Sequence, residues 1–147
     1  MSPEREAEFA EVLAFLDFYF NYVKKPEVTS GLGIQAEAER IAEVYGRSKA
    51  LEGARQAVND VIEELGDLKP EGVEILDEAL RSAGIRTFSE VRRAYGRAYK
   101  KILKRGSIRT ETEYYLVNGL VVDLASDIPP SERVLLQQML SAYETPG

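Results

Sequence analysis

The stretch FSEVRRAYGRAYKKILKR, residues 88–105, has a pattern that predicts an α-helix, and the rest of the chain can be interpreted outward from it. On a helical wheel its apolar and aromatic side chains fall within an arc of roughly 80°. These side chains are Phe88, Val91, Tyr95, Tyr99 and Ile102. Its basic side chains fall on the opposite side, within an arc of roughly 180°. They are Arg92, Arg93, Arg97, Lys100, Lys101 and Lys104. The stretch is therefore predicted to be one amphipathic helix with a basic face.

Both ends of this helix carry sequence signals. Thr87 and Glu90 have the spacing of a capping box, in which the hydroxyl accepts a hydrogen bond from the amide three residues later. Gly106 follows the last basic residue, and glycine suits the left-handed conformation that commonly ends a helix. The helix is therefore expected to begin after Thr87 and to end before Gly106.

The positive charge of this region contrasts with the rest of the chain. Residues 86–109 contain nine Lys or Arg residues and one acidic residue, a net charge of +8, whereas the whole chain carries −6. The remainder therefore carries −14. Such a charge contrast indicates what the chain can bind and says nothing about its fold. Three interpretations of the basic face are open. The basic face can be solvated or paired with the chain's own acidic helices, it can dock on an acidic protein surface, or it can contact nucleic acid phosphates.

The composition excludes several chemistries, because the 147 residues include no Cys and no His. Disulfides, Cys- or His-ligated metal sites and nucleophiles activated by a His cannot be assembled. Catalysis would have to use carboxylates, Lys or Tyr, with a hard cation such as magnesium. We therefore predict a protein that is not an enzyme and that has neither a cofactor nor a metal.

The sequence also lacks membrane and export signals. No apolar run approaches the roughly 20 residues that a membrane-spanning helix needs. The N-terminus is acidic and has no signal-peptide pattern. With the absence of Cys, these features predict a cytoplasmic protein without a membrane partner.

The first helix is expected over residues 3–23, with Ser2 as its N-cap and Pro3 in its first turn. Six of the thirteen aromatic residues lie between Phe9 and Tyr22 and cover more than half of the helix circumference. One interpretation is a central helix that packs on both sides. The other is an interface for a homodimer or another partner.

Further helices are expected on both sides of a linker at residues 24–30 and of the break at residues 68–70. Residues 34–65 have helical spacing and predict one long helix or two nearly continuous ones, with Gly46 and Gly53 as the places where it can bend. A short helix follows over residues 71–82 and ends at Gly84. The triplet Tyr-Gly-Arg at 45–47 recurs at 95–97, where a helical glycine would let another helix approach closely.

The segment after the basic helix gives two conflicting signals. Asn118-Gly119 between apolar runs is typical of a β-hairpin. Thr110 and Glu113 form a second capping box, however, and leucines recur every four residues at 116, 120 and 124. We predict a helix, because a lone hairpin would be marginal in a helical protein. The last helix is expected to start at Asp127 or Ser131 and to reach residue 143.

Together these segments predict an all-α fold, a single domain over residues 1–147 built as a bundle of five or six helices. Its function is predicted to be that of a small acidic protein–protein interaction module, such as an adaptor, an inhibitor or an immunity-like protein. The predicted partner-binding residues are Arg92, Arg93, Arg97, Lys100, Lys101 and Lys104.

Two alternatives use other features of the chain. Residues 76–82, the turn at 83–85 and the basic helix have the order of a DNA-binding helix-turn-helix, in which Arg92, Arg93 and Arg97 would make the contacts. The sequence EELGDL at residues 63–68 resembles the EExxD half of the magnesium site in all-α nucleotide pyrophosphatases of the MazG type. This resemblance implies metal-dependent hydrolysis of a triphosphate, with Glu63, Glu64 and Asp67 as ligands. The partner motif of that family, ExxE one helix upstream, is missing.

Overall fold

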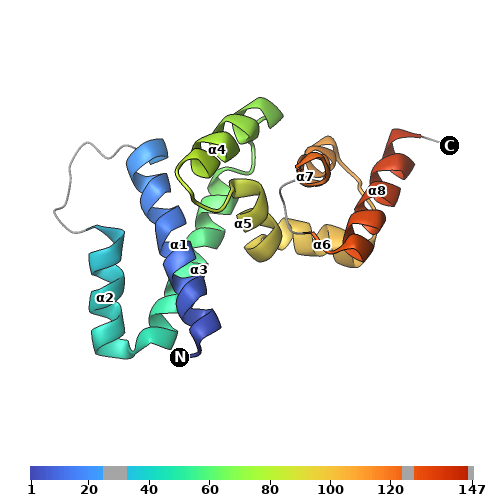
Figure 1. The fold of residues 1–147 in the computed structure, drawn as a ribbon. Coiled ribbons are helices and arrows are strands. Elements are labelled where there is room, and N and C mark those ends of the chain that lie inside the picture. The colour runs from blue at the N-terminus through green and yellow to red at the C-terminus, as the bar shows by residue number, and fades with distance from the viewer. Residues whose placement is uncertain (25–32, 124–127, 146–147) are drawn as a thin grey trace.

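The computed structural model describes residues 1–24, 33–123 and 128–145, and every regular element in these ranges is helical (Figure 1). The elements are α1 (Pro3–Phe18), the π-helical segment η1 (Tyr19–Lys24), α2 (Ile34–Tyr45), α3 (Arg47–Glu64), α4 (Pro70–Ser82), α5 (Phe88–Tyr95), α6 (Arg97–Arg105), α7 (Glu111–Val122) and α8 (Pro130–Glu144). The predicted all-α class is therefore confirmed. Among the described residues, no helix is both long and apolar enough to cross a membrane.

The described residues form eight α-helices, whereas five or six were expected. The stretch at residues 34–65, for which one helix or two were predicted, and the single helix predicted at residues 88–105 are each divided at a glycine. Gly46 separates α2 from α3 with φ = +94°, a backbone conformation that residues with a side chain rarely adopt. Gly96 separates α5 from α6 with an extended backbone, at φ = −70° and ψ = 129°. The basic segment is therefore two helices and not one.

The expected reason for the two Tyr-Gly-Arg triplets is wrong. A Cβ added at Gly46 would have no heavy atom within 4 Å, so no neighbouring helix approaches closely there. At Gly96 an added Cβ would lie 2.4 Å from the backbone oxygen of Arg92, in the helix that precedes it. Both glycines instead permit sharp changes in chain direction.

Helix α1 begins as its sequence predicts. The Ser2 hydroxyl accepts a hydrogen bond from the Arg5 amide at 3.2 Å, and Pro3 occupies the first turn. The helix continues as η1 to Lys24, so that helical structure extends through the expected range. Most of its apolar residues belong to the core, as expected for a central helix that packs against its neighbours. The buried ones are Phe9, Val12, Leu13, Phe15 and Leu16.

The end of this helical segment is more exposed than its middle. The ring of half-buried Phe18 stacks on that of Tyr22, with the centroids 4.9 Å apart. Tyr22 is 50% exposed and Val23 is 38% exposed. A homodimer through the first helix stays a prediction, and the exposed residues Tyr22 and Val23 would form its interface.

The connection between α4 and α5 is short and hydrogen-bonded. Gly84 adopts φ = +73°, and the Ile85 amide donates to the Leu80 carbonyl at 2.9 Å. The Thr87 hydroxyl then accepts from the Glu90 amide at 3.2 Å and caps α5, as predicted. This connection packs α5 against α4, while α5 also contacts α3 and α7.

The segment with conflicting signals is a helix, which confirms that prediction. Helix α7 runs through Asn118-Gly119, and its Thr110 cap accepts from the Glu113 amide at 3.1 Å. Leu116 and Leu120 are buried on one face. Residues 25–30 of the predicted linker, Leu124 and the proposed helix start at Asp127 lie outside the described residues.

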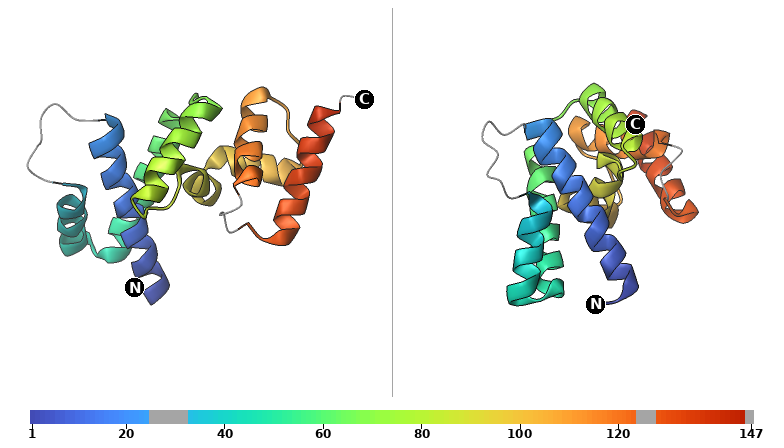
Figure 2. Two further views of the ribbon diagram at one scale, coloured as in Figure 1. Left: turned by 45° about the horizontal axis from the view of Figure 1, so that its top comes forward. Right: turned by 60° about the vertical axis from the view of Figure 1, so that its left-hand side comes forward.

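The buried apolar residues of the described chain form two clusters. Eighteen residues from α1 to α5, including Tyr19 of η1, form the first. Ten residues from α6, α7, α8 and the flanking positions Ile108 and Ile128 form the second. Figure 1 and the left view of Figure 2 show α1–α3 at one end of the molecule and α6–α8 at the other, with α4 and α5 between them. The boundary between the clusters coincides with Gly96, and the single-domain organisation stays a prediction.

Candidate functional site

The two halves of the basic segment have different surroundings. Its first half, α5, contacts α3, α4 and α7, so its arginines meet other parts of the chain. Its second half, α6, buries Tyr99 and Ile102 against the second apolar cluster and exposes the opposite side. The six residues predicted to bind a partner therefore do not form one surface.

Arg92 is buried, although it was expected on the outer face. It is 7% exposed, and its guanidinium carbon lies 4.9 Å from the centroid of the Phe88 ring. Burial lowers the pKa of Arg92 to about 10, while the negative charge of Asp77 acts in the opposite direction. Its Nε is buried without a hydrogen-bond partner among the described residues. On the helical wheel Arg92 lies at the edge of the basic arc, roughly 20° from Tyr99, which explains why packing can enclose it.

Asp77 is the acidic residue whose charge acts on Arg92, and its carboxylate binds the first turn of α5. Its two carboxylate oxygens accept hydrogen bonds from Ser89, one from the amide at 3.1 Å and one from the hydroxyl. Burial raises the pKa of Asp77, and the hydrogen bonds from Ser89 oppose this shift. Sequence reasoning missed both residues. The available signal was the position of Asp77 on the apolar stripe of α4, beside Val73 and Leu80.

Arg93 is paired internally. Its Nε and Nη2 donate to the two carboxylate oxygens of Glu132 in α8, at 2.7 and 2.9 Å. The Tyr99 hydroxyl also donates to Glu132. The hydrogen bond from Arg93 lowers the pKa of Glu132. Arg93 therefore ties α5 to α8 and is not available as a surface cation.

The basic residues of α6 lie at the surface. Arg97, Lys100, Lys101 and Lys104 are all exposed, and they share an arc of roughly 100° on the side opposite Tyr99 and Ile102. Arg97 has a long ion pair with Glu63, at 3.7 Å between two exposed side chains. In the described ranges, no ion pair involves the three lysines. We call these four residues the α6 basic face.

A groove of about 760 Å³ lies between α4 and α7, with α5 contributing to its floor. Its acidic lining residues are Asp67, Glu74, Asp77, Glu78, Glu111 and Asp123. Its basic lining residues are Lys69, Arg81 and Arg92. Leu68, Val73, Leu116 and Val122 supply apolar surface. The groove thus combines a buried guanidinium with largely acidic walls.

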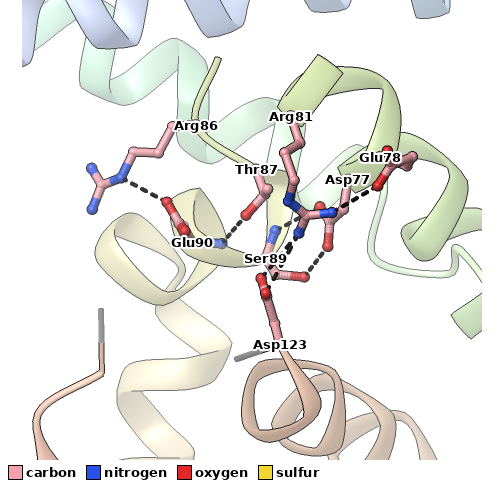
Figure 3. A network of polar contacts seen from close by, with 8 residues as sticks. All are labelled: Asp77, Glu78, Arg81, Arg86, Thr87, Ser89, Glu90 and Asp123. Atoms are coloured by element: carbon pink, nitrogen blue, oxygen red, sulfur yellow. Dashed lines mark hydrogen bonds and ion pairs between the residues drawn. The ribbon is translucent and has the colours of Figure 1, made fainter. Parts of the chain in front are cut away.

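Arg81 connects the two walls of the groove. It donates to Glu78 of its own helix at 2.9 Å and contacts the Asp123 carboxylate, which follows α7, at 3.4 Å (Figure 3). Figure 3 also shows the Asp77–Ser89 hydrogen bonds close by. Arg81 therefore contacts two carboxylates directly, whereas Arg92, within the described chain, has only the nearby charge of Asp77.

The EELGDL residues do not form a carboxylate cluster. Glu64 accepts a hydrogen bond from the Tyr19 hydroxyl at 2.5 Å, and Glu63 makes its ion pair with Arg97. Among the described residues, no three acidic side chains are arranged so that they could hold a metal ion. The pyrophosphatase alternative therefore has no support from the geometry of this segment.

Comparison with protein families, with curated proteins and with solved structures gave no match for this chain.

Proposed function

We propose that this protein is a non-enzymatic protein–protein interaction module that docks on an acidic partner surface through the α6 basic face. The observation that supports the proposal most directly is the exposure of Lys100, Lys101 and Lys104 without a counter-ion from the described chain. Their charges repel one another along a narrow arc, and an acidic partner surface would relieve that repulsion.

The contrast with the other cations of the chain strengthens this argument. Arg47, Arg55, Arg93 and Arg105 each have a carboxylate within 2.7 Å, from Glu6, Glu8, Glu132 and Glu113 respectively. The first interpretation of the basic segment was a face that is either solvated or paired internally, and internal pairing describes Arg93 and Arg105. Internal pairing does not describe the lysines of α6, which leaves solvation and docking for them; we favour docking because it would relieve their mutual repulsion.

Nucleic acid binding is the less favoured alternative. Of the three arginines that a helix-turn-helix reader would use, Arg92 is buried and Arg93 is paired with Glu132. Only Arg97 is exposed. The net charge of −6 also opposes the approach of a phosphate backbone.

Photo-crosslinking in the native host tests the proposal. A p-benzoylphenylalanine at position 98, an exposed alanine of α6 beside the basic face, should yield a crosslinked protein. The same group at Gln56, which is exposed on α3, should not. Reversing the charge of Lys100, Lys101 and Lys104 to Glu should abolish the product, because electrostatic attraction then becomes repulsion.

A matched variant controls for the change in net charge. Arg5→Glu, Arg40→Glu and Lys49→Glu alter three exposed cations on other helices, and this variant should retain the crosslink. Persistence of the product in the α6 charge-reversal variant would contradict the proposal. A product that disappears on nuclease treatment would instead support the nucleic acid alternative.

A further inference from the structure

The groove between α4 and α7 has the dimensions of a small-molecule site. Its volume of about 760 Å³ falls within the roughly 300–1,000 Å³ of most ligand pockets. Two helices from different apolar clusters form its walls, and α5 closes its floor with Ser89 and Arg92. The groove does not include the lysines of α6, so ligand binding in the groove is independent of docking through the α6 basic face.

Arg92 supplies the recognition group. Its side chain lines the groove, is more than nine-tenths buried, and leaves Nε without an acceptor among the described residues. The charge of Asp77 acts on Arg92, but no hydrogen bond or ion pair joins the two side chains, and the Asp77 carboxylate accepts from Ser89 instead. A buried guanidinium is a strong, planar donor, and its best complement is a planar carboxylate.

The acidic walls restrict the rest of the ligand. Six carboxylates and three basic groups line the groove. Arg81 is already held by Glu78 and Asp123, whereas no hydrogen bond or ion pair joins Glu74 to any other described residue. A phosphate or a dicarboxylate would be repelled by these walls, whereas a ligand that also carries a cationic group would be attracted to Glu74.

We propose that the groove binds a small zwitterion, with its carboxylate on Arg92, an aliphatic spacer along Val73 and Leu116, and its ammonium group near Glu74. The apolar part of the lining would then remove the spacer from water. Because Arg92 is enclosed and Glu74 is exposed, the carboxylate would enter first and the ammonium group would stay near the mouth of the groove.

Calorimetric titration with ω-amino carboxylates of three to seven carbons tests the proposal, with hexanoate, hexylamine and inorganic phosphate as matched probes. We expect saturable binding of at least one ω-amino carboxylate, and weaker binding of the probes that lack either charge. Arg92→Met should weaken binding by roughly tenfold to a hundredfold, as for loss of a charged hydrogen bond. Glu74→Gln should weaken it by about threefold, as for an exposed ion pair.

Lys49→Met, at an exposed position of α3 that does not line the groove, is the control and should bind like the wild type. If Arg92→Met does not fold, Arg92→Lys and the exposed Glu74→Gln substitution carry the test. The proposal fails if no ω-amino carboxylate binds with a Kd below about 10 mM, since a weaker Kd lies outside the range of typical small-ligand affinities. It also fails if hexanoate or phosphate binds as tightly, or if Arg92→Met leaves the affinity unchanged.

Discussion

Arg92 and Arg93 are neighbours in the sequence, but tertiary packing gives them opposite electrostatic environments. Arg93 is half-buried, and its charge is neutralised by two hydrogen bonds to Glu132. Arg92 is more deeply buried, and its Nε has no acceptor among the described residues. Burial of the Arg92 charge, which in the described part of the chain only the nearby Asp77 charge offsets, opposes folding. A fold that contains a buried hydrogen-bonded ion pair is strongly destabilised when one partner is removed.

We predict that Arg92→Met increases the free energy of unfolding by about 1–2 kcal/mol, because a side chain of similar length then fills the site without a desolvated charge. Arg93→Met should decrease it by about 1–3 kcal/mol, because Glu132 loses its charged donor. Urea denaturation of both variants checks this contrast. A decrease for Arg92→Met would show that the contact of its guanidinium with the Phe88 ring and its attraction to Asp77 together outweigh the desolvation.

The same ion pair predicts a pH dependence. The pKa of Glu132 is lowered in the folded protein from its ordinary value of 4.5, chiefly by the hydrogen bond from Arg93. This interaction therefore stabilises the fold above pH 4.5, and its contribution is lost as the pH falls through the lowered folded pKa. The difference in unfolding free energy between wild type and Glu132→Gln should be positive at pH 6 and smaller at pH 3.

Glu43→Gln provides the comparison for this measurement, since the Glu43 side chain is exposed on α2. Its effect on stability should be small at both pH values. An unchanged Glu132→Gln difference at pH 3 would contradict the assignment of the stabilisation to the carboxylate charge.

Among the elements, the connection at Gly96 determines which helices each half of the basic segment packs against. If helix continued through residue 96, Arg92 and Lys101 would belong to one amphipathic cylinder. The extended backbone at Gly96 instead lets α5 pack between α3, α4 and α7 while α6 joins α7 in the second cluster. The conformation itself is open to any residue, so the requirement for glycine is steric.

We predict that Gly96→Ala decreases the free energy of unfolding by about 1–3 kcal/mol, because its Cβ would lie 2.4 Å from the backbone oxygen of Arg92 and the end of α5 must move. Gly53→Ala, in the interior of α3 where no heavy atom lies within 4 Å of the added Cβ, should increase it by about 0.5–1 kcal/mol. Thermal and urea unfolding of the two variants measure whether each substitution decreases or increases the free energy of unfolding. Equal effects would show that only helix propensity matters at residue 96.

For the whole molecule, the two apolar clusters differ in size and so in their capacity to stabilise a fold. The first contains eighteen buried residues and the second ten, among the residues described. A small core seldom supports an independent unit, so α6–α8 are expected to depend on the rest of the chain. The contacts of α5 with α7 and the Arg93–Glu132 pair provide that dependence.

We therefore predict an asymmetric response to a matched pair of core substitutions. Leu51→Ala in the first cluster should increase amide hydrogen exchange in all helices, because the second cluster cannot persist alone. Leu136→Ala in the second cluster should increase exchange mainly in α6, α7 and α8. Each should lower stability by about 2–5 kcal/mol. Continued protection of α6–α8 in Leu51→Ala would indicate two independent units.

Much of the local structure was predictable because its causes are local. The Thr87 and Thr110 caps, the left-handed Gly106 and the choice of helix over hairpin at Asn118-Gly119 depend on residues within about four positions of each other. The division at Gly96 was not predictable in this way. A glycine in a helical pattern is compatible with both a continuous and a broken helix, and the choice depends on what each half packs against.

The sequence by itself determined the all-α class, the amphipathic character of residues 88–105 and the segregation of positive charge there, because periodicity, capping and composition are properties of neighbouring residues. Only the tertiary structure decided which of those charges reach the surface. Arg92 is enclosed beside Asp77, Arg93 meets Glu132 across 39 residues, and the lysines of α6 remain exposed. Burial and pairing depend on groups that are distant in the chain, and no local pattern specifies where those groups will lie.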